Sequence, residues 1–181
     1  MARKHRDKAA GTFHVYTHSV WAAAELYRDD RDRLTFLHEL AHAVAKTQWR
    51  CIAFCLVQSH YHVLVEVEDG TLPVGMHSLN FRYAVRFNSR HRMKGHAFAA
   101  RYGARRIKDD DDLLNVYRYV ARNPVEAGLC ESAAAWTWSS YPGTAGVAAP
   151  ASFVDAGRVV SCFDGPYETA LARLRKFVDG P

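Results

Sequence analysis

Three groups of residues carry side chains that could do chemistry at the spacings in which they occur. His60 and His62 are two residues apart, so on a β-strand both imidazoles project from one face and can reach one metal ion. Tyr119 and Asn123 are four residues apart, which places a phenol nucleophile beside an amide oxygen on one face of a helix. The segment 38–42 reads His-Glu-Leu-Ala-His, a second candidate metal motif.

The segment 38–42 matches the H-E-x-x-H pattern of zinc proteases, in which two histidines bind zinc and the glutamate acts as general base. No glycine-containing extension follows to supply a third ligand, and the apolar stripe of the expected helix leaves His38 and His42 near its surface. Two histidines on a strand are, for their part, often half-exposed surface residues that bind no metal. Taken alone, these motifs leave both a zinc protease and a two-histidine metal site open.

Length and composition restrict the class of protein. A chain of 181 residues is the size of one globular domain, and 49% hydrophobic with 24% charged residues is typical of a soluble fold. No apolar run approaches the roughly 20 residues of a membrane span, so no membrane contact is expected. The four cysteines include no C-x-x-C pair, which favours reduced thiols and a cytoplasmic location.

The positive charge is concentrated in one part of the chain. Residues 70–108 include nine arginines and lysines and no acidic residue, although the formal net charge of the whole chain is only +5. Such a segment predicts a surface that binds a phosphate backbone. The residues expected to grip DNA are Arg82, Arg86 and Arg90, which share one helix face, together with Arg101, Arg105, Arg106 and Lys108.

Hydrophobic periodicity predicts the secondary structure. Strands are expected at 13–20, 51–57 and 60–68, and helices from 32, at 73–91, at 109–122 and at 166–178. The segment 93–107 is predicted to be a loop or a short hairpin, and 143–151 a linker, whereas the aromatic segment 136–141 is not assigned. This order predicts an α+β fold with a ferredoxin-like antiparallel sheet flanked by helices.

The order of the motifs resembles that of one family. His60-Tyr61-His62 follows an apolar strand, Phe87-Asn88-Ser89-Arg90 ends a basic helix, and Gly95-His96-Ala97-Phe98 comes next. The most specific parts are the block 119–129, which begins with Tyr119 and includes Asn123, and the tryptophan-serine cluster 136–141. In these features the chain resembles the REP-associated tyrosine transposases, a branch of the HUH single-strand nucleases.

The resemblance implies a set of roles for individual residues. Tyr119 is the expected nucleophile, and His60, His62 and Asn123 are the expected ligands of Mg²⁺ or Mn²⁺. The implied activity is that of a single-stranded DNA endonuclease and strand transferase, which acts on DNA hairpins such as REP-type palindromes through a 5′-phosphotyrosine intermediate. Alternatives are a domesticated, non-catalytic hairpin-binding protein and the zinc protease considered above.

The resemblance also implies an organisation. We expect a catalytic domain at 1–142 and a linker with a helical tail at 143–181, packed on the same domain. The expected partner is single-stranded DNA with a hairpin, bound by a monomer or a homodimer in the bacterial cytoplasm, at the nucleoid.

Overall fold

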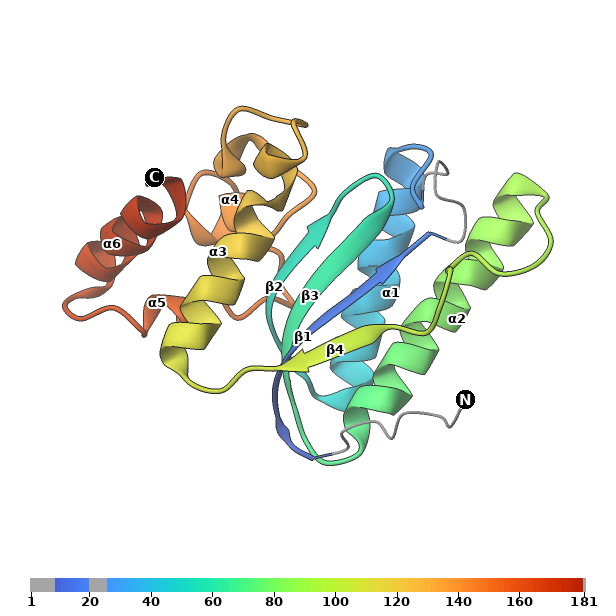
Figure 1. Ribbon diagram of the computed structural model, residues 1–181, viewed down its shortest axis with the longest axis horizontal. Coiled ribbons are helices and arrows are strands. Elements are labelled where there is room, and N and C mark those ends of the chain that lie inside the picture. The colour runs from blue at the N-terminus through green and yellow to red at the C-terminus, as the bar shows by residue number, and fades with distance from the viewer. Residues whose placement is uncertain (1–8, 20–25, 181) are drawn as a thin grey trace.

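Four antiparallel strands form one sheet in a computed structural model that describes residues 9–19 and 26–180 (Figure 1). The strands are β1 (Gly11–His18), β2 (Arg50–Leu56), β3 (His60–Val67) and β4 (Gly103–Arg106), and their order in the sheet is β2-β3-β1-β4. Helices α1 (Asp30–Thr47) and α2 (Thr71–His91) make the two crossovers. The element order β1-α1-β2-β3-α2-β4 in one antiparallel sheet confirms the predicted α+β, ferredoxin-like architecture.

The two faces of the sheet are covered by different parts of the chain (Figure 1). Helices α1 and α2 lie on one face, and α3 (Asp110–Glu126) lies on the other. The remaining helical elements follow α3 and pack around it: η1 (Ala133–Ala135), α4 (Tyr141–Thr144), α5 (Gly157–Val160) and α6 (Tyr167–Asp179). None of the helices in the described ranges is both long and apolar enough to span a bilayer.

The sheet separates two hydrophobic cores because side chains alternate along each strand. On β3, Tyr61, Val63 and Val65 are buried against α1 and α2. Leu64 points to the opposite face and is buried in the core beneath α3. His60 and His62 belong to this second face, so the position of α3 decides what surrounds their imidazole rings.

β4 lies within the segment 93–107 that the sequence predicts to be a loop or hairpin. It pairs with β1 as an edge strand, with Phe13 opposite Arg106 and Tyr16 opposite Gly103. Its sequence, Gly-Ala-Arg-Arg, has no apolar alternation because three of its four residues are exposed. An edge strand without a buried face gives no period-two signal, which explains why the pattern does not identify it.

The C-terminal end of α3 also differs from the prediction. The helix was expected to end near residue 122, but it continues through Pro124 to Glu126. Gly128 then adopts a left-handed conformation (φ 69°), and the backbone N–H groups of Gly128 and Leu129 donate to the carbonyls of Val125 and Pro124. This is a Schellman closure, which satisfies carbonyls at the helix end and keeps residue 123 within the helix.

The aromatic segment 136–141 covers the free edge of β2. The backbone N–H of Leu56 donates to the carbonyl of Trp138, and the indole N–H of Trp136 donates to the carbonyl of Leu56. The following segment, predicted to be a linker, contains the end of α4 and the buried Ala145. Covering the outer edge strand removes a row of unpaired backbone groups that could pair with another chain.

A buried ion cluster joins α1 to α2. The carboxylate of Glu39 is fully buried and forms ion pairs with Arg82 and Arg86, whose side chains are 38% and 51% exposed. Where the last turn of α2 meets the first turn of α1, Arg90 pairs with Asp29 and Asp32. The acidic partners that are missing from residues 70–108 are therefore supplied by another element.

The cluster predicts an asymmetric effect of substitution on stability. The double variant Arg82→Ala/Arg86→Ala leaves the buried carboxylate of Glu39 without a partner, so we expect the free energy of unfolding to fall by about 3–5 kcal/mol. Glu39→Ala should cost less, because the two half-exposed guanidinium groups it releases can be solvated. Urea unfolding at neutral pH measures both, with the exposed Arg31→Ala as a control for loss of a cation on α1. A larger loss in Glu39→Ala than in the double variant would contradict this account.

Candidate functional site

The site is built on the antiparallel pairing of β1 with β3. In this register Tyr16 lies opposite His62, and His18 lies opposite His60. Paired residues project from the same face of a sheet, and residues two apart along a strand do so as well. His14 therefore joins them, which gives a row of four histidines and one tyrosine on the face that α3 covers.

Helix α3 brings Tyr119 onto this row. The centroid of its ring lies 5.3 Å from that of His62 and 5.9 Å from that of His14, both edge-on. The Tyr119 side chain is 44% exposed, whereas Tyr117 is 1% exposed and packs near Tyr141. Of these two tyrosines of α3, only Tyr119 can meet a ligand as large as a nucleic acid.

Nε2 of His62 is buried and has no hydrogen-bond partner among the described residues, and Oδ1 of Asn123 is buried with no partner beyond the approach of the Asn123 side chain to His60. Both residues are nearly inaccessible, at 4% and 8% exposure. A buried polar atom without a partner is costly and calls for an explanation. Each of these atoms offers a lone pair, and imidazole nitrogen and amide oxygen are both known metal donors.

The amide of Asn123 is the non-histidine donor in the predicted metal site. Within the ranges 9–19 and 26–180, no group of three or more His, Cys, Asp or Glu side chains is placed to hold a metal ion. In the predicted ligand set, His60 and His62 would supply two nitrogens and Asn123 on α3 would supply the third donor. The donor set therefore fits a divalent cation that accepts mixed nitrogen and oxygen ligands.

The imidazoles are kept neutral by their surroundings. Burial, reinforced by the neighbouring His14 and His60, lowers the pKa of His62 to about 2. Burial and the charge of Arg105 lower the pKa of His14 to about 4. Burial also lowers the pKa of His60, His18 lowers it further, and a hydrogen bond with the side chain of Asn123 partly opposes the shift. Neutral rings keep the lone pairs that coordination requires.

His14 also holds His62 in place. Its Nε2 lies 2.9 Å from Nδ1 of His62, a buried hydrogen bond between the two rings. A proton on Nδ1 of His62, donated to His14, leaves the lone pair of His62 on the unpartnered Nε2. A metal-binding histidine is commonly oriented through its other nitrogen in this way.

Tyr16 completes the site on its open side. The side chain is 36% exposed, and its ring centroid lies 6.3 Å from that of His62. The ring lies directly over Gly103 of β4, where a Cβ atom would come within 2.5 Å of Cζ of the tyrosine. The absence of a side chain at Gly103 therefore leaves room for the aromatic ring beside the histidines.

Sequence reasoning did not include His14, Tyr16 and His18 in the site. Their signal is the alternation His-x-Tyr-x-His within 14–18, which has the same period as His60 and His62. Two strands that each carry polar rings on one face are candidates for direct pairing. That alternation would have indicated a shared surface before the register was known.

The H-E-x-x-H motif does not form a comparable site. His38 and His42 are exposed on α1, while Glu39 is buried and neutralised by Arg82 and Arg86. A glutamate committed to two guanidinium groups in the core cannot act as general base for water bound at the surface. The structure therefore argues against a zinc protease.

The residues predicted to grip DNA are spread over both faces of the sheet. Arg82, Arg86 and Arg90 lie along the seam between α1 and α2, on the face opposite Tyr119, and are paired with carboxylates. Their ion pairs reduce the charge they present to solvent. Their role in DNA binding stays a prediction.

The other predicted DNA contacts lie nearer to the site. Arg105 is the register partner of His14, so it shares the face of the site, and it pairs with Asp112. Arg106 donates to the carbonyl of Ala10, while Lys108 is exposed. Arg101 lines a groove beside α2. These four residues also stay predicted DNA contacts.

Comparisons with known proteins agree with this arrangement. Residues 12–123 match the model of a family described as "Transposase IS200 like". A solved structure described as a REP-associated tyrosine transposase bound to a REP hairpin superposes with a TM-score of 0.70 at 14% identity, covering 88% of this chain and 93% of the other. At that identity the likeness shows the fold. A search of the curated proteins finds no match.

The contact between Tyr16 and Gly103 makes a prediction about stability. Gly103→Ala places a methyl group against the ring, so we expect a loss of about 1–3 kcal/mol in the free energy of unfolding, as for other overpacked positions. The same substitution in a Tyr16→Ala background removes the clash and should cost much less. Denaturant unfolding of the four proteins gives the coupling energy, and equal costs in both backgrounds would contradict the packing described here.

Proposed function

Because this chain belongs to the family of IS200-like transposases, we propose that it is a single-stranded DNA endonuclease and strand transferase with Tyr119 as its nucleophile. One observation carries the proposal: an accessible phenol stands edge-on to His62, on the helix that also carries the buried amide of Asn123. Such an arrangement suits attack on a phosphodiester, since the protein itself supplies the attacking oxygen.

The proposed substrate is a DNA hairpin with a single-stranded flank. The solved relative of the same fold is bound to a REP hairpin, which supports this class of substrate. The location of Tyr119 supports it as well. A phosphate of a flexible single strand can approach a nucleophile on the exposed side of a helix more readily than a phosphate held within a duplex can. Arg105, on the face of the site, is a candidate contact for the backbone of that strand.

The proposed reaction exchanges one phosphodiester for another. The phenol oxygen of Tyr119 forms a bond to phosphorus and loses its proton, while the bond from phosphorus to the 3′ oxygen breaks and that oxygen takes up a proton. The product is a 5′-phosphotyrosine and a free 3′-hydroxyl. Because the two ester bonds are similar in energy, a second 3′-hydroxyl can reverse the step and join strands without ATP.

The residues that would hold a divalent cation are His60, His62 and Asn123. Bound Mg²⁺ or Mn²⁺ supplies positive charge to a non-bridging phosphate oxygen, and an amide ligand together with phosphate oxygens favours these two ions. The chain itself contributes orientation. His14 fixes the ring of His62, and α3 holds Tyr119 and Asn123 one turn apart on the same side.

The decisive prediction concerns the covalent adduct. With Mg²⁺ or Mn²⁺ and a hairpin oligonucleotide with a single-stranded flank, wild-type protein should form a protein–DNA adduct that survives denaturing electrophoresis. Tyr119→Phe should abolish the adduct, because the attacking oxygen is missing. Tyr117→Phe is the matched control and should retain it, because that hydroxyl is buried.

Two outcomes would overturn the proposal. Hairpin binding without any adduct in wild-type protein would favour the non-catalytic DNA-binding alternative. An adduct lost in Tyr117→Phe but retained in Tyr119→Phe would mean that the nucleophile has been wrongly assigned.

A second prediction concerns metal affinity and needs no DNA. Titration calorimetry with Mn²⁺ should show one site that His62→Ala removes. His14→Ala should weaken it by about 10–100-fold, as is usual when the hydrogen-bond partner of a ligand is lost. His14→Gln should recover part of the affinity, because its amide oxygen can accept from Nδ1 of His62. The exposed His42→Ala is the control, and an equal loss in that variant would count against the assigned site.

A further inference from the structure

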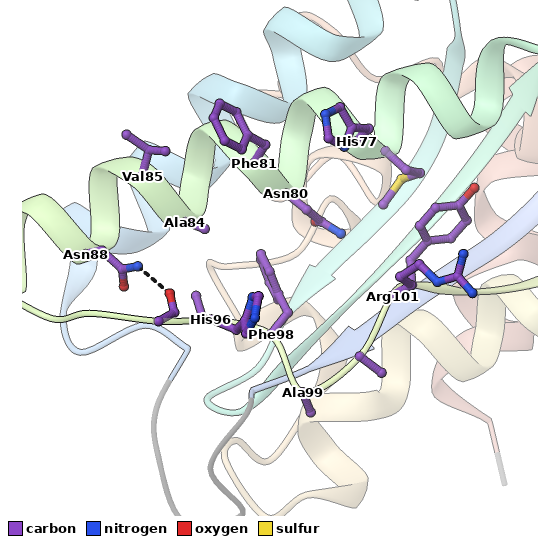
Figure 2. A pocket seen from close by; sticks show the side chains of 15 residues that line it. His77, Asn80, Phe81, Ala84, Val85, Asn88, His96, Phe98, Ala99 and Arg101 are labelled. Carbon is purple, nitrogen blue, oxygen red and sulfur yellow. Dashed lines mark hydrogen bonds between the residues drawn. The ribbon is translucent and has the colours of Figure 1, made fainter.

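A groove of about 680 Å³ runs between α2 and the segment 95–102 (Figure 2). Along α2 it is lined by His77, Asn80 and Ala84, and along the opposing segment by His96, Phe98 and Arg101. The two walls are tied together at one end, where the side-chain amide of Asn88 donates to the carbonyl of Gly95 at 2.8 Å. The groove is separate from the row of histidines beneath α3.

The lining combines flat apolar surfaces with polar edges. Phe81 is 59% exposed, and its ring is stacked on His77 with centroids 5.9 Å apart and planes 16° from parallel. Asn80 accepts from the Tyr61 hydroxyl through Oδ1, so its NH₂ group is the end that can donate to a ligand. A nucleobase has the matching chemistry, with an aromatic face for stacking and an edge that forms hydrogen bonds.

The charge of the groove suits the backbone that accompanies a base. The residues that line it include Arg101 and two histidines but no aspartate or glutamate. A phosphate therefore meets a cation and no repelling carboxylate from the lining. A purely apolar peptide or lipid would leave Asn80 and Arg101 without polar partners, so these ligands fit the lining less well.

The segment that forms one wall of the groove is attached to the end of β1, the strand that carries His14, Tyr16 and His18 of the candidate site. The backbone N–H of Ala99 donates to the carbonyl of His18 at 3.1 Å, and Phe98 forms an isolated bridge with Ser19. The ring of His18 in turn lies 5.0 Å from that of His60. One wall of the groove is thus hydrogen-bonded to the strand that carries the outermost histidine of the site.

We propose that this groove binds unpaired nucleotides of the DNA strand that passes through the Tyr119 site, with bases stacked against Phe81 and His77 and phosphate near Arg101. The proposal rests on the proposed function, since it takes the same strand as its ligand. It adds a place where base identity can be read away from the reacting phosphate, because Asn80 faces the edge of a stacked base.

The test measures binding, in full-length Tyr119→Phe protein that cannot form an adduct. The probes are a blunt hairpin, the same hairpin with a single-stranded flank, and a flanked hairpin whose flank is abasic. Phe81→Ala removes an exposed stacking surface, and Ala84→Trp fills the groove. Val74→Ala is the matched control, since Val74 is an exposed apolar residue of the same helix outside the groove.

We expect Phe81→Ala and Ala84→Trp to raise the Kd for the flanked hairpin about tenfold, the order of effect that loss of base stacking produces. Affinity for the blunt and abasic probes should not change. A 2-aminopurine in the flank should lose its fluorescence on binding to the parent protein and keep it with Phe81→Ala. Equal weakening for all three probes, or no weakening for any, would overturn the proposal.

A single-stranded oligonucleotide without a hairpin separates this inference from the proposed function. If its binding depends on Phe81 while wild-type protein forms no adduct, the groove is confirmed as a binding site and the proposed catalytic function is wrong. If adducts form but neither binding nor 2-aminopurine fluorescence depends on Phe81, catalysis stands and the groove assignment is wrong.

Discussion

The antiparallel register between β1 and β3 determines which side chains can meet at the site, because side chains alternate between the two faces of a strand. The opposite faces of the same strands carry Phe13, Val15, Val63 and Val65, all buried against α1 and α2. A slip of one residue would turn these apolar side chains toward α3 and the histidines into the other core. Hydrophobic burial on one face therefore fixes the position of the polar rings on the other.

Helix α3 completes the site because its own packing leaves only one possible orientation. Leu113, Tyr117 and Val120 are buried in the second core, and Tyr119, off this stripe, lies against His14 and His62 and is partly exposed to solvent. The Schellman closure after Glu126 matters for the same reason, because it keeps Asn123 in helical geometry one turn after Tyr119. If the helix ended at 122, the amide and the phenol would not be held to a common face.

Much of this arrangement could be predicted from the sequence, and the exceptions have physical causes. The alternation of Tyr61, Val63 and Val65 identifies β3, and the apolar stripe of α3 separates Tyr117 from Tyr119. β4 could not be found, because an exposed edge strand carries no hydrophobic pattern. The contribution of β1 has another cause: the His-x-Tyr-x-His alternation marks a polar face on this strand, but only the strand pairing decides which polar face it meets.

Charge shows the same limit of local patterns. Residues 70–108 are uniformly basic along the chain, yet in space Glu39, Asp29 and Asp32 of α1 and its N-cap region lie against three of the arginines. Ion pairs between elements are invisible to a count along the sequence. Arg101, which lines the groove, and the exposed Lys108 are consequently better candidates for contact with phosphate than the arginines on the inner seam of α2.

The unpartnered atoms of His62 and Asn123 connect stability to function. Each buried polar group without a partner costs on the order of 1–3 kcal/mol, whereas an apolar residue of similar shape at either position would carry no such penalty. Burial of apolar side chains in the two cores is the favourable contribution that opposes this cost. Any ligand that satisfies both atoms binds only the folded chain and so stabilises it, which makes the site the place where binding and folding are coupled most directly.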